Sequence, residues 1–229
     1  MSASTVPLII AIDGPAASGK GTLARRLAAH FGLAHLDTGK IYRATALGVL
    51  QVGGDPADPA AAEKAARHLD FSRLTDPRLL QEDVARGSSQ VAAIPAVRAA
   101  LLEAQRRFAH HPPPLDGRSA RGAVLDGRDI GTVVCPDATV KLFITASAES
   151  RAERRAKELR QRGATAIYEA VLQDIRERDA RDSERQVAPL AAAPDAITID
   201  TTLLDADQVF ERASNLIARY CAPVGAEWS

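Results

Sequence analysis

A glycine-rich stretch near the start of the chain has the composition of a phosphate-binding loop. It follows the apolar run 8–12 and reads Gly-Pro-Ala-Ala-Ser-Gly-Lys-Gly-Thr. Glycines let backbone amides approach a polyphosphate, the following helix adds the positive end of its dipole, and Lys20 adds a full charge. A glycine-rich turn without a ligand is the alternative, but the strand before it and the helix after it favour phosphate binding. The residues expected in this cradle are Gly14, Pro15, Ala16, Ala17, Ser18, Gly19, Lys20, Gly21 and Thr22.

One position of this loop departs from the strict pattern, which places Ser or Thr directly after the lysine. Here Gly21 stands in that position and Thr22 comes next. We therefore expect the hydroxyl of Thr22 to meet Mg²⁺ or the phosphates.

Polar residues also follow two other apolar strands. The run 34–36 ends in Asp37-Thr38-Gly39, and the run 123–125 ends in Asp126-Gly127-Arg128-Asp129. In an open parallel sheet, ligands bind outside the carboxyl ends of the strands, so these side chains and the cradle are expected on one rim. The alternative for the two aspartates that follow the strands directly is that they only cap helices.

A charged helix near residue 178 carries a more specific signal. At about 100° per residue, Val171, Ile175, Arg178, Asp182 and Arg185 fall on one face of a helix. The apolar stripe thus continues as Arg, Asp, Arg, and inward-facing arginines need an anion such as phosphate, which their planar fork binds in a bidentate manner. If the helix ended before Arg178, these residues would instead be an ordinary surface set of ion pairs.

Apolar strands alternating with helices predict the elements that position these residues. Nearly continuous apolar strands indicate a parallel α/β sheet with helices on both faces. Strands are expected at 8–12, 34–36, 123–125, 139–144 and 196–199. Helices are expected at 38–52, as two short segments within 57–90 broken near Pro77, at 94–108, at 148–184 with a break near Gly163, and near the end of the chain. The segments 40–110 and 150–185 are too long for simple crossovers, so we expect them to form flaps over the sheet edge.

Bulk composition excludes several classes of protein. The formal net charge is zero, so the total charge indicates neither a nucleic acid nor an anionic membrane as partner. The two cysteines, Cys135 and Cys221, have no metal-binding spacing, which favours free thiols in a reducing compartment. With neither a signal peptide nor an apolar span, we expect a cytoplasmic protein, and we expect a disordered tail around Trp228.

Five segments together resemble the bacterial cytidylate kinase family, within the nucleoside monophosphate kinases of the P-loop group. They are Ile-Asp-Gly-Pro through Gly-Lys-Gly-Thr (12–22), Leu-Asp-Thr-Gly-Lys-Ile-Tyr-Arg (36–43), Ser-Gln-Val-Ala-Ala-Ile-Pro with Arg98 (89–98), Asp-Gly-Arg-Asp-Ile-Gly-Thr-Val-Val (126–134) and Arg-Asp-Ala-Arg-Asp-Ser-Glu-Arg-Gln-Val-Ala-Pro-Leu (178–190). The Gly-Lys-Gly-Thr variant is typical of nucleoside monophosphate kinases in general. The third and fourth segments narrow the resemblance to the cytidylate branch.

The resemblance implies a P-loop kinase fold with a five-stranded parallel sheet, a monophosphate-binding flap and a lid. It implies a core over 1–37, 99–150 and 179–229, a flap over 38–98 and a lid over 151–178. The family often carries an antiparallel insert in the flap, but residues 70–88 show no alternating strand pattern, so the insert looks largely deleted.

The implied activity is transfer of phosphate from ATP, with Mg²⁺, to CMP or dCMP by a monomer. Roles carry over as follows: Lys20, Arg128, Asp129 and Arg185 in catalysis; Arg155 at ATP; and Thr38, Arg43, Ser89, Arg98, Arg128, Asp129, Arg178, Asp182 and Arg185 at the acceptor nucleotide.

The resemblance places Ser89, Arg98 and Asp129 at the edge of the base, and we call these three residues the base-binding set. Their hydrogen-bonding chemistry favours cytosine. Arg98 offers only donors, which suit the ring nitrogen and O2 of cytosine, whereas Ser89 and Asp129 can accept from its amino group. Uracil reverses the donor and the acceptor, so it would leave buried groups unpaired at a cost of about 1–3 kcal/mol each.

Two rival functions stay open at this point. Another small-molecule kinase of the same fold would explain the cradle but neither the base-binding set nor the charged helix face. A nucleotide-binding protein without turnover is the other rival. A guanine-reading switch normally carries an Asn-Lys-x-Asp segment, and Asn215 is the sole asparagine of the chain, which excludes that version.

Overall fold

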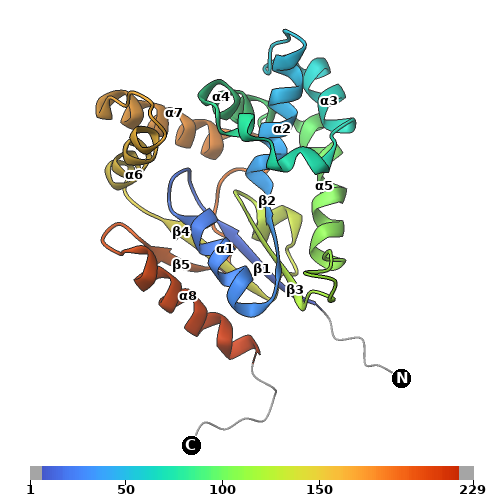
Figure 1. The fold of residues 1–229 in the computed structure, drawn as a ribbon, viewed down its shortest axis with the longest axis vertical. Coiled ribbons are helices and arrows are strands. Elements are labelled where there is room, and N and C mark those ends of the chain that lie inside the picture. The colour runs from blue at the N-terminus through green and yellow to red at the C-terminus, as the bar shows by residue number, and fades with distance from the viewer. Residues whose placement is uncertain (1–6, 222–229) are drawn as a thin grey trace, which may run out of the picture.

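The computed structural model describes residues 7–221 and contains one five-stranded parallel sheet (Figure 1). The strands are β1 (Leu8–Asp13), β2 (Ala34–Asp37), β3 (Gly122–Gly127), β4 (Val140–Thr145) and β5 (Ile197–Asp200). Their order across the sheet is β2-β3-β1-β4-β5, so β1 is central and pairs with both β3 and β4. All five expected strands are confirmed.

Alternate residues of the strands face two separate cores, which explains their continuous apolar character. On one face, Ile10, Ile12 and Val124 pack with α1 (Lys20–Phe31) and α8 (Ala206–Cys221). On the other face, Ile9 and Ala11 of β1, with Ala123 and Leu125 of β3, pack with α2 (Thr38–Gln51), α3 (Pro59–Arg67) and α5 (Pro95–His110). Helices therefore cover both faces of the sheet.

The segment between α2 and α5 departs in part from the prediction of two short helices. Between α3 and α4 (Glu82–Val91) lie two 3₁₀ turns, η1 (Phe71–Thr75) and η2 (Pro77–Leu80). Asp70 and Asp76 each accept a hydrogen bond from the backbone amide two residues later, which starts one turn in each case. The expected break near Pro77 is present as the start of η2, and residues 70–88 contain no strand.

A small separate core holds this flap together. Ala44 and Leu47 of α2 pack against Leu79 of η2 and Val84 of α4. In Figure 1 the helices α2, α3 and α4 project together from one end of the sheet.

The charged region after β4 forms two packed helices, α6 (Ala148–Gln161) and α7 (Tyr168–Glu184). Gly163 separates them and has a φ of 78°, which glycine adopts at little cost. The buried residues Ala152, Ala156, Val171 and Ile175 form their shared core. The expected interruption near Gly163 is therefore confirmed. The helix also runs unbroken past Arg178, so the expected face is helical through Asp182, whereas Arg185 lies just beyond the end of α7 in an extended conformation.

The remaining element is a short π-helical turn, η3 (Ile130–Val134), directly after β3. Asp13, at the end of β1, accepts hydrogen bonds from the backbone amides of Ile130 at 2.7 Å and Gly131 at 2.8 Å. Trp228, expected in a disordered tail, lies outside the described residues. Among the helices of residues 7–221, none combines the length and apolar character needed to cross a membrane.

Two glycines offer opposite tests of this packing. A Cβ on Gly122 would lie 2.0 Å from the Leu8 carbonyl oxygen, so Gly122→Ala has to push β3 away from β1. A Cβ on Gly48, inside α2, would lie 3.6 Å from the Ala65 Cβ, an ordinary contact, so Gly48→Ala is expected to raise stability by about 0.5–1 kcal/mol. Urea unfolding of both variants measures the two signs, and a Gly122→Ala protein as stable as the wild type contradicts the β1–β3 register.

Candidate active site

The glycine-rich loop passes between β1 and the N-terminus of α1. Gly14 has a φ of 148°, and a Cβ there would lie 2.0 Å from the Ile144 carbonyl oxygen of β4. Gly19 caps α1 with a φ of 91°. Both positions therefore require glycine, and the loop wraps the first turn of α1 as the sequence predicts.

Lys20 lies buried at the base of this loop, where its ammonium group donates a hydrogen bond to the Pro15 carbonyl oxygen at 2.9 Å. Burial and the nearby charge of Arg128 lower the pKa of Lys20 to about 7. A polyphosphate in the loop would supply the negative charge that this site lacks.

The two residues after Lys20 differ in direction. Gly21 borders the cleft, and a Cβ on it would lie 3.5 Å from Oδ2 of Asp126. Thr22, by contrast, is exposed, is not among the residues that line the cleft, and accepts a long hydrogen bond of 3.4 Å from Arg25. The expected metal contact at Thr22 therefore finds no support in this geometry, because the residue that follows the lysine in the strict pattern faces the cleft instead.

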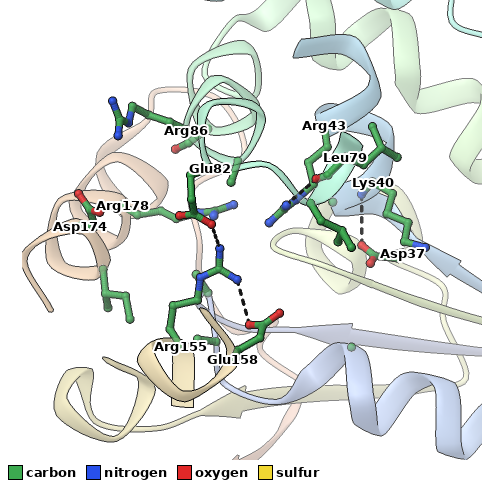
Figure 2. A pocket seen from close by; sticks show the side chains of 18 of the residues that line it. Asp37, Lys40, Arg43, Leu79, Glu82, Arg86, Arg155, Glu158, Asp174 and Arg178 are labelled. Carbon is green, nitrogen blue, oxygen red and sulfur yellow. Dashed lines mark hydrogen bonds and ion pairs between the residues drawn. The ribbon is translucent and has the colours of Figure 1, made fainter. Parts of the chain in front are cut away.

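A cleft of about 510 Å³ opens in front of the loop, between the flap and the α6–α7 pair. Figure 2 shows basic side chains reaching into it from both sides, among them Arg43 from α2 and Arg178 from α7. Arg43 donates a hydrogen bond to the Leu79 carbonyl oxygen at 2.7 Å, which holds it against η2. Basic residues outnumber acidic ones along the walls, so the cleft suits an anionic ligand.

A smaller pocket of about 40 Å³ adjoins this cleft between α2, α4, α5, α7 and the turn that follows β3. It brings together eight of the nine residues expected at the acceptor nucleotide, and Arg43, the ninth, lines the larger cleft. The eight are Thr38, Ser89, Arg98, Arg128, Asp129, Arg178, Asp182 and Arg185. Thr38 is fixed by a hydrogen bond from its hydroxyl to the Asp126 carbonyl oxygen at 2.8 Å.

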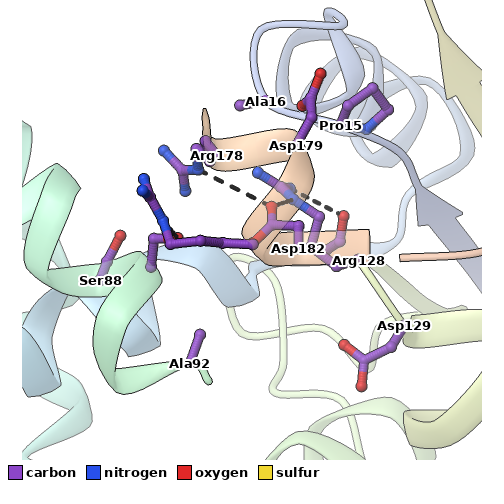
Figure 3. Close-up of polar contacts among 12 residues, drawn as sticks. Pro15, Ala16, Ser88, Ala92, Arg128, Asp129, Arg178, Asp179 and Asp182 are labelled. Atoms are coloured by element: carbon purple, nitrogen blue, oxygen red, sulfur yellow. Dashed lines mark hydrogen bonds and ion pairs between the residues drawn. The ribbon is translucent and has the colours of Figure 1, made fainter. Parts of the chain in front are cut away.

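Two buried carboxylates in this pocket each lie between two arginines. Figure 3 shows the first of them, Asp182, between Arg128 and Arg178. Asp182 accepts a hydrogen bond from Nε of Arg128 at 2.8 Å and lies 4.0 Å from Nε of Arg178. Asp129 is paired with Arg98 and lies 3.8 Å from Nη2 of Arg185. Burial alone would raise the pKa of Asp182, but the charges of Arg128 and Arg178 outweigh it, so the pKa lies below its usual value.

Two arginine nitrogens in the pocket lack a hydrogen-bond partner. Nε of Arg178 and Nη2 of Arg185 are both buried and make no hydrogen bond among residues 7–221, because their carboxylate neighbours lie 4.0 Å and 3.8 Å away. Burial, with the charges of nearby arginines, lowers the pKa of Arg178 to about 10. Unpaired buried donors are costly, so this site fits an anion that accepts from both.

The lid arginine expected at ATP has protein partners in this structure. Arg155 of α6 pairs with Glu82 at the start of α4, and its Nη1 donates to Glu158 at 2.9 Å (Figure 2). Arg155 thus reaches the cleft, but it is bound to the flap and not to the phosphate loop.

Several residues of the site escaped the sequence analysis. Asp13 holds the η3 turn that follows Asp129, and the Tyr42 ring lies 5.5 Å from the Arg98 guanidinium. Arg151 joins α6 to Asp179 of α7 at 2.6 Å and reaches the Ala16 carbonyl oxygen at 3.4 Å. An aspartate that ends a buried strand was the available signal for Asp13, whereas nothing local marks the others.

Asp37 and Asp126, the two aspartates that follow apolar strands, are not simple helix caps. Asp37 does cap α2, because its carboxylate accepts from the Lys40 amide at 3.2 Å. It also lines the cleft, and burial and the neighbouring Asp126 raise its pKa. Asp126 caps no helix, and its carboxylate is bound to His35.

Comparison with known proteins gives a consistent result. The model of the cytidylate kinase family matches residues 10–219. A cytidylate kinase of Paramagnetospirillum magneticum is 60% identical over 209 residues, which are 91% of this chain and 97% of that protein. A cytidylate kinase of Rhodospirillum rubrum is 58% identical over 212 residues, 92% of this chain and 97% of that protein.

A solved structure of an uncharacterized protein from Eubacterium ventriosum has the same fold, with a TM-score of 0.52 at 16% identity. The alignment covers 93% of this chain and 99% of that one. The family match spans every element that carries the site, from the phosphate loop to the arginines of α7. This chain therefore belongs to the cytidylate kinase family.

Proposed function

We propose that this protein transfers the terminal phosphoryl group of ATP to CMP or dCMP, with ATP on residues 14–22 and the acceptor across the smaller pocket and the adjoining part of the cleft, where Arg43 lies. The observation that carries the proposal is the pair of unpaired buried arginine nitrogens, on Arg178 and Arg185, beside a pocket that also holds Ser89, Arg98 and Asp129. An anion of the size of a phosphate monoester can accept hydrogen bonds from the two arginine nitrogens. The edge of a cytosine base can pair with Ser89, Arg98 and Asp129.

The reaction needs no general base. The second pKa of a phosphate monoester is about 6, so the acceptor oxygen is already deprotonated at pH 7. This oxygen bonds to the γ-phosphorus while the bond to the β-phosphate oxygen breaks, and ADP leaves with the electron pair. Catalysis then rests on placing the two nucleotides and on balancing charge with Lys20, Arg128 and Arg185.

Mg²⁺ fits the carboxylates at the base of the cleft. Asp37 and Asp126 end neighbouring strands in register, and both line the cleft next to Lys20. Within the described residues no cluster of three or more His, Cys, Asp or Glu side chains forms a metal cage. The phosphates would therefore supply most of the ligands, and the ion would neutralise charge that develops during transfer.

We also propose that the flap, residues 38–98, and the lid, residues 151–178, close over the two nucleotides and exclude water. Their separate small cores support movement as units. Because both nucleotide sites are built from one chain, we propose a monomer. A cytoplasmic location is proposed because CMP and ATP occur there, and the buried free thiol of Cys135 fits a reducing compartment.

An assay of ADP release with MgATP and a panel of acceptors tests the function. We expect the highest kcat/KM with CMP or dCMP, and little turnover with UMP, AMP, GMP or shikimate. A reaction without acceptor measures ATP hydrolysis as the control. Turnover chiefly with another acceptor would contradict the assignment of the base site, and tight ATP binding without any turnover would favour a silent nucleotide binder.

The buried pair Arg98 and Asp129 is expected to set base choice. The double variant Arg98→Met/Asp129→Ala removes both charges together and should lower the CMP/UMP ratio of kcat/KM by about 30-fold or more, since two buried contacts are lost and each is worth about 1–3 kcal/mol. Arg107→Met, an exposed arginine on the same helix, is the matched control. An unchanged CMP/UMP ratio in the double variant means that the pair does not read the base.

ATP binding is expected to take up protons near pH 8. Lys20, with its pKa lowered to about 7, is mainly neutral there, and bound phosphates raise that pKa and protonate the amine. Titration calorimetry with metal-free ATP in buffers of different ionisation enthalpy should report uptake approaching about one proton.

The control for this titration is Lys20→Arg, whose guanidinium is always charged, so uptake should disappear. Wild-type protein that takes up no more protons than this variant would show that Lys20 is already charged in the free enzyme.

A further inference from the structure

A histidine outside both cavities is bound to a carboxylate that lines one of them. His35, on β2, has a side chain that is 19% exposed, and its Nε2 lies 2.7 Å from Oδ1 of Asp126. His35 borders neither the large cleft nor the smaller pocket, whereas Asp126 lines the cleft. Any effect of the imidazole on the reaction therefore passes through Asp126.

Strand register explains how the two side chains meet. In the parallel β2–β3 pair, Asp37 lies opposite Asp126 and His35 lies opposite Val124. Val124 belongs to the core that packs under α1, so His35, Asp37 and Asp126 share the sheet face that α1 covers. His35 is thus a diagonal neighbour of Asp126, on the side away from the cleft.

The two oxygens of Asp126 have different surroundings. Oδ1 faces the imidazole, whereas Oδ2 points to the first turn of α1, 3.5 Å from where a Cβ on Gly21 would lie. Gly21 borders the cleft directly after Lys20. The hydrogen bond at Oδ1 thus leaves Oδ2 directed at the phosphate loop.

This carboxylate needs such a restraint because of its neighbour. Asp37 ends the adjacent strand, and the two negative charges repel each other. Asp37 is held by the Lys40 amide at the start of α2, but no backbone amide of the described residues binds the Asp126 side chain. Without His35, the Asp126 carboxylate would be free to turn away from Asp37 and from the loop.

We propose that His35 is a positioning residue: its Nε2–H donates to Oδ1 of Asp126 and so keeps Oδ2 aimed at the Mg²⁺ that accompanies ATP. The inference rests on the proposed function, because Oδ2 meets such an ion only if residues 14–22 hold MgATP. The role is that of an outer partner that orients a metal-facing carboxylate, and loss of such partners typically costs about 10- to 100-fold in metal affinity.

The test measures ATP affinity with and without the metal. Calorimetry gives the Kd for ATP in Mg²⁺ and in EDTA, for the wild type, His35→Leu, His35→Gln and His35→Asn. A Gln amide can place its nitrogen near the position of Nε2, whereas the Asn amide is too short to reach Oδ1. We expect His35→Leu and His35→Asn to reduce the Mg²⁺-dependent gain in affinity by about 10-fold or more, and His35→Gln to retain most of it.

The same variants separate positioning from a purely structural role. Binding of metal-free ATP should match the wild type in all three variants, and the Mg²⁺ concentration for half-maximal CMP phosphorylation should rise in His35→Leu and His35→Asn. If His35→Leu does not fold, the comparison of His35→Gln with His35→Asn still decides, because the two amides differ only in reach.

An unchanged Mg²⁺ dependence in His35→Asn and His35→Leu would overturn the proposal. Failure of the proposed function looks different, because the wild type itself would then show no Mg²⁺-dependent turnover of CMP. A wild type that phosphorylates CMP, together with variants that respond to Mg²⁺ as the wild type does, would refute the role of His35 alone.

Discussion

In the smaller pocket, two buried carboxylates are the charged partners of four arginines. The arrangement of the rest of the site depends on this excess of positive charge. Asp182 lies between Arg128 and Arg178, and Asp129 lies between Arg98 and Arg185. A buried guanidinium without a full partner costs several kcal/mol. The surplus of two positive charges matches a phosphate monoester, which carries a charge of about −1.5 to −2 at pH 7.

The same imbalance ties distant parts of the chain together. The four arginines come from α5, from the turn after β3, from α7 and from the residue after α7. None of these elements can bury its charge without the others, because each carboxylate is shared across elements. The flap, the core and the α7 end of the lid region therefore meet at the place where the acceptor phosphate would complete the charge balance.

The spacing of apolar, glycine and charged residues along the chain was sufficient to predict the parts of the site that depend on a single strand, loop or helix. The five strands, the glycine-rich loop between β1 and α1, and the helical run from Val171 to Asp182 are confirmed because strand, loop and helix periodicity determine them. The contacts of His35 and Asp13 were missed, because their partners lie 91 and 117 residues away and no local pattern gives such pairings. The 3₁₀ turns were missed for another reason: their starting aspartates also suit ordinary helix caps.

The solvent exposure of each acidic side chain indicates whether its ion pair with an arginine can be broken at low cost. Asp129 and Asp182 have side chains that are 6% exposed, so releasing their arginines would leave buried charges unpaired. Glu82, the flap partner of the lid residue Arg155, has a side chain that is 51% exposed. Water can therefore solvate its carboxylate at little cost when the ion pair with Arg155 breaks. A phosphate that binds Arg155 thus competes with a weakly held surface carboxylate, whereas a phosphate that binds Arg178 and Arg185 adds to carboxylates that stay in place. By this reasoning the carboxylate contacts of the smaller pocket are in place before any ligand binds, whereas the contact between Arg155 and Glu82 is the one that a phosphate can replace.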